Sequence, residues 1–223
     1  MAVNIAIDGT AGSGKGTIAK GLSQALGYYH LDSGAMYRTI TYKCLEENVD
    51  VADKYSVCEI VKNLKYDILF KKDKSSNPIQ INLLDGEDLG QKIRSERISK
   101  NVSLLSQHEC VREYTKKLQL DLAKKYNIII EGRDIGTIIL PNADFKFFVT
   151  ASLEERARRR VNQLELPESQ LKEVMEDIRE RDRRDMERDI APLKVAEGSY
   201  YIDNNGLTVK ETIDKMLNII NNK

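Results

Sequence analysis

The stretch VNIAIDGTAGSGKGT, residues 3–17, decides the fold of this chain. It begins as an apolar run that predicts a buried strand, and it continues through a glycine-rich loop into the start of a helix. Lys15 adds a cation that can follow a phosphoryl group, and the positive end of the helix dipole points at the same place. Four glycines let the backbone turn its N–H groups inward: Gly9, Gly12, Gly14 and Gly16. The order of these parts predicts a phosphate-binding loop, with an ordinary strand–helix turn as the alternative.

The composition limits the classes of protein to which the chain can belong. With 223 residues, of which 41% are hydrophobic, it can form one α/β domain with insertions. Its 35 Lys and Arg balance its 35 Asp and Glu, so we expect no nucleic-acid or membrane partner, and any anion site must be a local cluster of arginines. No run is apolar for long enough to span a membrane, and the first residues do not follow the pattern of a secretion signal, so we expect a protein that is neither exported nor anchored.

The three cysteines, Cys44, Cys58 and Cys110, lie far apart in the sequence. Their number is odd and their spacing shows no pairs, which predicts neither a zinc site nor a disulfide framework. We therefore expect reduced cysteines and a cytoplasmic protein.

The alternation of apolar patterns predicts a parallel sheet with helices on both faces. After the loop, apolar residues at helical spacing continue to Gly27, which ends the helix. Further strands are expected at 28–31, 127–131, 145–149 and 200–202, and further helices at 35–48, at 99–126 and from 209 onward.

Two segments fall outside this pattern. The β-like runs 66–70 and 79–84, joined by the polar segment 71–78, predict a small antiparallel insert. Residues 153–189 have helical propensity, break near Pro167 and carry too much charge for a core, so we expect them to form an outer cover.

Polar side chains follow two of the predicted strands. Asp32 and Ser33 lie where one strand ends, and Glu131, Arg133 and Asp134 follow another. Because ligands bind at the carboxyl ends of parallel strands, these residues are candidates for a ligand site. Arg133 can bind a phosphate with two donors, Asp134 can accept hydrogen bonds, and Glu131 lies where an acid can orient magnesium or its waters. The alternative is a strand-end turn with a solvated salt bridge.

Arginines are frequent in the predicted cover. Those at 156 and 158–160 follow two glutamates, and Arg181, Arg184 and Arg188 share one helical face with Asp185. A solvated face is one interpretation. The other is a set of arginines that closes over two phosphorylated substrates, neutralises their charge and excludes water.

Taken together, these motifs make the chain similar to the bacterial cytidylate kinases, within the nucleoside monophosphate kinase branch of P-loop proteins. The resemblance covers nearly the whole length and rests on residues 7–17, 31–38, 132–137, 181–185 and 191–193. It implies a P-loop NTPase-type α/β core of parallel strands flanked by helices, with a small antiparallel insert that binds the monophosphate and a short helical lid. The implied boundaries are 1–62, 98–152 and 190–223 for the core, 63–97 for the insert and 153–189 for the lid.

The resemblance also implies roles for individual residues. Residues implied to hold ATP are Gly9, Thr10, Ala11, Gly12, Ser13, Gly14, Lys15, Gly16 and Thr17. Residues implied to hold the acceptor are Ser33, Arg38, Arg133 and Arg188 at its phosphate, Arg181 and Asp185 at its ribose, and Ser103, Arg112 and Asp134 at its base. Cytosine suits this last group, because Asp134 can accept from its amino group and Arg112 can donate to its ring acceptors. The implied catalytic set is Lys15, Arg133, Asp134, Arg156, Arg160 and Arg188.

Some positions differ from the common pattern. Gly16 stands where the general motif has Ser or Thr, so Thr17 is not assigned as a metal ligand. We expect no protein metal ligands, with Mg²⁺ held mainly through phosphates and water. Thr10, Glu131 and Arg183 replace a frequent proline and two frequent aspartates.

The expected activity is transfer of the γ-phosphoryl group of ATP to CMP or dCMP, in pyrimidine nucleotide metabolism, by a monomeric enzyme. One alternative is the same architecture with another acceptor, such as UMP, AMP or a non-nucleotide hydroxyl compound. The other is a nucleotide-operated switch or RNA-binding protein, although the chain lacks an Asn-Lys-x-Asp motif for guanine and a basic stripe.

Overall fold

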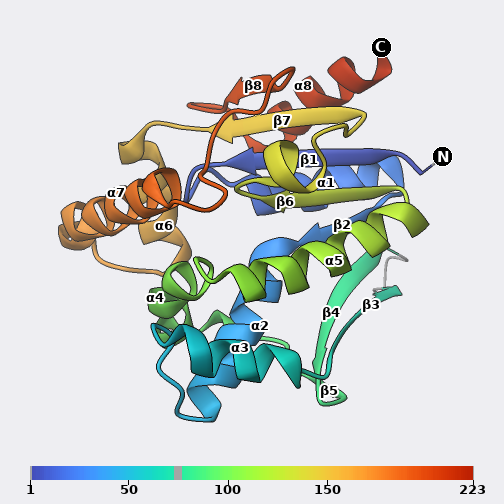
Figure 1. Cartoon of the computed structure of the whole chain (residues 1–223). Helices are drawn as coiled ribbons and strands as arrows, with labels where there is room; N and C mark the ends of the chain where they lie inside the picture. The colour runs from blue at the N-terminus through green and yellow to red at the C-terminus, as the bar shows by residue number, and fades with distance from the viewer. Residues whose placement is uncertain (1, 73–76, 223) are drawn as a thin grey trace.

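A five-stranded parallel sheet lies at the centre of the chain (Figure 1), in a computed structural model that describes residues 2–72 and 77–222. The strand order β2-β6-β1-β7-β8 places β1 in the middle, and the predicted α/β class is confirmed. The strands are β1 (Asn4–Gly9), β2 (Tyr29–Asp32), β6 (Ile128–Gly132), β7 (Phe145–Thr150) and β8 (Tyr200–Asp203).

Successive side chains of β1 enter two different apolar clusters. Ile5 and Ile7 pack with α1 (Lys15–Leu26) and α8 (Val209–Asn221). Ala6 belongs to the other cluster, with α2 (Ser33–Glu46) and α5 (Glu109–Lys125). Because both faces of the sheet are covered, the central strands are continuous apolar runs instead of alternating ones.

The chain leaves β1 through a close backbone contact. A Cβ atom at Gly9 would lie 2.0 Å from the carbonyl oxygen of Val149 on β7, so only glycine fits there. Gly14 then precedes α1 with φ 80° and ψ 6°, in the left-handed region that favours glycine. These two positions turn the loop between β1 and α1, residues 9–17, which we call the P-loop.

The predicted insert is a second, antiparallel sheet with the order β3-β4-β5. Its strands are β3 (Tyr66–Lys72), β4 (Pro78–Leu84) and β5 (Glu87–Asp88), of which the short β5 was not expected. Residues 73–76, within the predicted polar connection 71–78, lie outside the described residues, as do residues 1 and 223.

The helical segment predicted at 99–126 is two helices. α4 (Glu96–Leu105) ends at Ser106, and α5 begins after His108, whose ring nitrogen lies 2.7 Å from the carbonyl oxygen of Val51. The backbone of His108 is extended, which ends the first helix and starts the second in a new direction. The sequence analysis also missed α3 (Lys54–Lys62).

The expectation that all cysteines are unpaired was wrong. Cys58 on α3 and Cys110 on α5 form a disulfide with a Cα–Cα distance of 5.8 Å, whereas Cys44 is free and buried. Packing of α3 against α5 brings together two residues that lie 52 positions apart. In the chain-entropy model, closing a loop of that length contributes on the order of 4 kcal/mol to stability.

The charged cover consists of α6 (Leu153–Gln163) and α7 (Leu171–Glu187), which are separated at Pro167 as predicted. Figure 1 shows both helices beside the carboxyl end of β1. Their buried apolar residues pack with Ala11 of the P-loop, so the cover is anchored on the phosphate-binding loop. The remaining helical turns are 3₁₀ at Lys92–Arg94 and Glu168–Gln170, and π-helical at Ile135–Ile139.

Candidate active site

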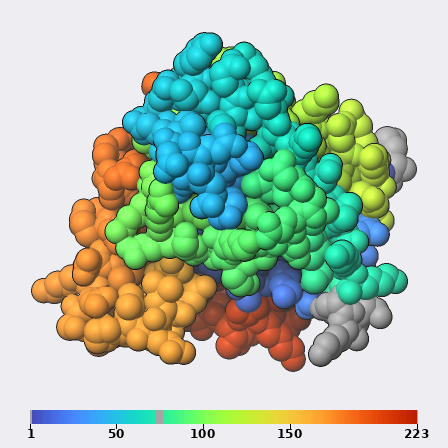
Figure 2. Space-filling view, turned by 90° about the horizontal axis from the view of Figure 1, so that it is seen from below, coloured from blue at the N-terminus to red at the C-terminus, as the bar shows by residue number. Residues whose placement is uncertain are grey.

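A cavity of about 860 Å³ opens at the carboxyl ends of β1, β2 and β6, where ligands of parallel sheets bind. The P-loop, the starts of α1 and α2, the insert, α4 and α7 all contribute to its lining. In the view from below, dark-blue atoms near the N-terminus are visible below the green atoms, with the orange segment of the cover to their left (Figure 2).

Lys15 lies at the P-loop end of this cavity. Its Nζ donates a hydrogen bond to the carbonyl oxygen of Thr10 at 3.5 Å. Burial, together with repulsion from the nearby positive charges of Arg133 and Arg181, lowers the pKa of Lys15 to about 7, against the opposite effect of Glu131. A cation under such repulsion favours an anionic ligand.

Glu131 explains why the chain has glycine at position 16. A Cβ atom on Gly16 would lie 2.8 Å from Glu131 Oε1, so the carboxylate occupies the space of the Ser or Thr of the general motif. His30 Nε2 lies 3.2 Å from the same oxygen, and Glu131 is buried. The carboxylate therefore faces the start of α1, beside the place where the loop would hold a phosphate.

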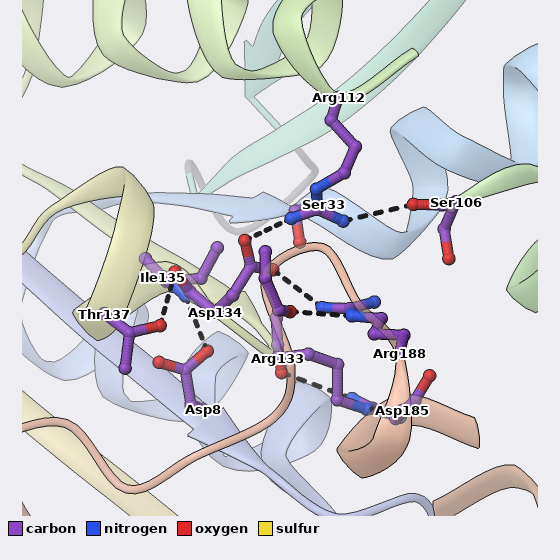
Figure 3. A network of polar contacts seen from close by, with 12 residues as sticks. Asp8, Ser33, Ser106, Arg112, Arg133, Asp134, Ile135, Thr137, Asp185 and Arg188 are labelled. Atoms are coloured by element: carbon purple, nitrogen blue, oxygen red, sulfur yellow. Dashed lines mark hydrogen bonds and ion pairs between the residues drawn. The ribbon is translucent and has the colours of Figure 1, made fainter. Parts of the chain in front are cut away.

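Asp134 is the centre of a buried charge network (Figure 3). One of its oxygens pairs with Arg112 Nη2, and the other lies 3.3 Å from Arg188 Nη2. Arg112 also donates to the carbonyl oxygen of Ser106 at 3.2 Å, which fixes its direction. Two guanidinium groups and one carboxylate in one place can recognise a ligand that has both hydrogen-bond donors and acceptors.

Arg133 and Asp185 form a second buried pair, with 2.8 Å between Nε and Oδ2. Beside them, Arg181 Nε is buried with no hydrogen-bond partner among the described residues. Burial lowers the pKa of Arg181 to about 10, and repulsion from Arg133 contributes. The structure thus brings together Arg133, Arg181, Asp185 and Arg188. The Nε–H of Arg181 could therefore donate a hydrogen bond to an anion or to a hydroxyl oxygen.

Two further predicted residues lie at the start of α2. Ser33 lines the cavity and its Oγ donates to the carbonyl oxygen of Glu131 at 2.6 Å. Arg38 also lines the cavity and donates to Ser99 Oγ at 2.9 Å, and burial lowers its pKa. Ser103 on α4 lines the same cavity.

Asp8, which the sequence analysis gave no role, orients the turn that carries these residues. Its two oxygens accept from the backbone N–H groups of Ile135 and Gly136, at 2.9 and 2.7 Å (Figure 3). Burial raises the pKa of Asp8 to about 6, although the two hydrogen bonds oppose this change. The last side chain before the P-loop therefore fixes the direction of Arg133 and Asp134.

Two predicted arginines lie elsewhere. Neither Arg156 nor Arg160 is among the described residues that line the cavity. The guanidinium of Arg156 is buried against Asp182 and P-loop backbone, which differs from the expected position over the transferring group. Arg160 is half-buried and donates to Gln163 Oε1 at 3.1 Å.

Among the polar cavity residues that were not predicted are Lys20, Gln80 and Arg94. Gln80 Oε1 accepts from the backbone N–H of Asp32 at 2.7 Å, and Arg94 lies 2.7 Å from a carboxylate oxygen of Asp32. The polar residues at alternate positions 80 and 82 of the predicted strand were the available signal, because alternate residues share one face of a sheet.

Within residues 2–72 and 77–222, no group of three His, Cys, Asp or Glu side chains could hold a metal ion. Of the helices in the described segments, none is both long and apolar enough to cross a membrane.

A glycine-rich loop after the central strand, a parallel sheet of this order and an arginine-rich cavity define a kinase of the P-loop class. The family model of cytidylate kinase matches residues 5–222, and the chain belongs to that family.

Curated relatives support the same assignment. The cytidylate kinase of Caldanaerobacter subterraneus subsp. tengcongensis is 44% identical over 222 residues, which cover 99% of this chain and 95% of the relative. The cytidylate kinase of Bacillus cereus is 40% identical over 220 residues, which cover 98% and 96%.

Solved structures share the fold alone. TT1252 from Thermus thermophilus matches with a TM-score of 0.52 at 15% identity and covers 98% of this chain and 96% of its own. The shikimate kinase of Bacteroides thetaiotaomicron matches with a TM-score of 0.51 at 12% identity and covers 98% of each chain.

Proposed function

We propose that this cavity is where the γ-phosphoryl group of ATP passes to CMP or dCMP, giving ADP and CDP or dCDP. As a member of the cytidylate kinase family, the chain is a nucleotide-binding phosphotransferase of pyrimidine metabolism. The observation that carries the proposed base recognition is the Arg112–Asp134–Arg188 network in the same cavity as the P-loop. Cytosine offers an amino donor to the carboxylate and ring acceptors to a guanidinium.

The proposed division of labour follows the two sides of the cavity. Lys15 and the inward N–H groups of the P-loop, other than that of Ala11, which donates to Asp182, hold the β- and γ-phosphates of ATP. Arg181 and Asp185 contact the acceptor ribose, and Ser103 lies at its base. The acceptor phosphate is held by Ser33, Arg38, Arg133 and Arg188.

The reaction needs no dedicated general base. The attacking oxygen of a nucleoside monophosphate is already anionic, so alignment and charge neutralisation carry the rate. Arg133 and Arg188 neutralise the acceptor. Arg160, which does not line the cavity in this structure, is the lid arginine that we propose covers the transferring group when the lid closes. Arg156 supports the P-loop instead.

The residues present fit Mg²⁺ bound mainly through phosphate oxygens and water. Glu131, beside Gly16, is placed to accept hydrogen bonds from water bound to the ion. When bound, Mg²⁺ supplies charge neutralisation at the donor phosphates.

The proposed organisation has a core of residues 1–62, 98–152 and 190–223, an acceptor insert of residues 63–97 and a lid of residues 153–189. We also propose a monomeric, cytoplasmic enzyme without nucleic-acid or membrane partners. The balanced charge supports the absence of such partners.

An acceptor panel tests the function. In a coupled assay with ATP, we expect kcat/KM for CMP or dCMP to exceed that for UMP by about 10- to 100-fold, because uracil presents O4 to the Asp134 carboxylate. AMP and shikimate are the controls for another base and for a hydroxyl acceptor. Preference for any of these three would overturn the assignment of Ser103, Arg112 and Asp134. ATP binding without transfer to any acceptor would favour a nucleotide-operated switch.

The lowered pKa of Lys15 leads to a pH prediction. With a pKa of about 7, much of Lys15 is neutral in the free enzyme at about pH 8, whereas bound phosphates stabilise the charged form and raise its pKa. ATP binding should therefore take up protons. Calorimetry in HEPES and Tris, whose ionisation enthalpies differ, measures this uptake, and Lys15→Met should abolish most of it. Equal uptake by both proteins would refute this origin of the protons.

A further inference from the structure

The backbone of one P-loop residue, Ala11, is held at both its N–H and its carbonyl group by the charged cover. The backbone N–H of Ala11 donates to Asp182 Oδ1 on α7 at 2.8 Å. The carbonyl oxygen of Ala11 accepts from Arg156 Nη1 on α6, also at 2.8 Å. The same Nη1 pairs with the second oxygen of Asp182, so the three groups form a closed ring of interactions.

This ring is buried. The side chains of Arg156 and Asp182 are only 8% and 10% exposed, and Ala11 is 4% exposed. Arg156 Nε also donates to the carbonyl oxygen of Ala151 at 3.0 Å, which fixes the guanidinium plane. Buried charges are costly unless they are paired and hydrogen-bonded, as these are, so solubility does not explain them.

The neighbouring contacts hold the loop against the same helices. A Cβ atom at Gly12 would lie 3.2 Å from Arg156 Cβ, so the loop backbone touches α6 directly. Ala11 also packs with Val161, Val174 and Ile178. Neither Arg156 nor Asp182 is among the described residues that line the cavity, so both act through the loop and not on the substrate.

We propose that Asp182 and Arg156 are positioning residues that fix the P-loop in the shape that binds the donor phosphates. The N–H of Ala11 is directed away from the phosphates and towards Asp182, and the pair links the donor site to both helices of the cover. This inference rests on the proposed role of ATP as donor. Its specific consequence is that loss of the pair weakens ATP binding and leaves CMP binding unchanged.

The test measures binding of a non-hydrolysable ATP analogue and of CMP separately by calorimetry. In the double variant Asp182→Leu with Arg156→Met, no buried charge remains unpaired, but Ala11 loses both partners. We expect the analogue to bind about 10- to 100-fold more weakly, with CMP within about twofold of the wild type. The double variant Asp182→Asn with Arg156→Gln keeps an acceptor and a donor for Ala11, and it should recover most of the affinity.

Val174→Ala is the matched control, because it loosens the same α6–α7 cluster without removing a partner of Ala11. Both hydrogen-bond partners of Ala11 stay in place in this control, so we expect it to lower the melting temperature but not the affinity for the analogue. An equal loss of analogue binding in this control, or equal losses for the analogue and CMP, would overturn the proposal, as would wild-type affinity in the Leu/Met variant. If that variant does not fold, Asp182→Ser is judged by the same comparison. Failure of the wild type to bind the ATP analogue would instead refute the proposed function.

Discussion

Replacement of Lys15 by alanine is expected to lower the rate of CMP phosphorylation by about three orders of magnitude or more while the protein still folds. Loss of a single neutral donor to a developing charge costs about 10²- to 10³-fold, and Lys15 carries a full positive charge once the donor phosphates are bound beside it. Its contribution to the fold is small, because its Nζ makes one long hydrogen bond, to Thr10, and is repelled by Arg133 and Arg181. A coupled assay gives the rate, and a melting curve checks the fold.

Lys20→Ala is the control for this variant. Lys20 is exposed, lies further along α1 and lines the same cavity. Its replacement therefore removes one positive charge from the cavity but leaves the cation at the P-loop in place. We expect its rate to stay within about tenfold of the wild type. Near-full activity of Lys15→Ala would remove Lys15 from the mechanism, and equal losses in both variants would reduce its role to general charge.

Asp134→Asn is expected to reduce both stability and the preference for CMP. The carboxylate is 7% exposed and pairs with Arg112 and Arg188, so its neutralisation leaves two buried guanidinium groups without a counter-charge. Breaking a buried pair costs about 3 to 5 kcal/mol of the free energy of unfolding. The amide no longer rejects the O4 of uracil, so the ratio of kcat/KM for CMP to that for UMP should fall about 10- to 100-fold. Urea unfolding and the acceptor assay measure the two effects.

Asp121→Asn is the matched change on α5. Asp121 is 49% exposed and lies 3.7 Å from Lys124, so its loss should change stability by less than about 1 kcal/mol and leave selectivity intact. If Asp134→Asn lost stability but kept the CMP preference, Asp134 would be a structural residue only.

The parts of the fold that could be predicted are those whose signal is local. The strands are apolar because they are buried on both faces, and the turn within residues 3–17 is rich in glycine because its backbone needs conformational freedom. Each of these patterns can be recognised within a few consecutive residues of the sequence. The helix α3 and the separation of α4 from α5 at His108 could not be predicted this way, because tertiary contacts decide them.

The same distinction applies to the site. Residues at the carboxyl ends of strands, such as Ser33, Arg133 and Asp134, were predictable, since topology brings strand ends together. Asp182 was not, because one buried aspartate in a run of charges looks the same as its solvated neighbours. The pairing of Cys58 with Cys110 was hidden for a similar reason: no sequence pattern reports contacts between α3 and α5.

The disulfide between Cys58 and Cys110 matters for the transfer of this part of the molecule to another protein. The bond joins the chain just before the insert to the chain just after α4, so residues 58–110 form a covalent ring with the acceptor hairpin inside it. A protein engineer who grafted this ring onto another kinase scaffold would transfer a module whose two ends are already tied together. Its attachment to the host would depend mainly on its contacts with α2 and with the end of β2 at Asp32, and the new framework would not need to hold the module closed.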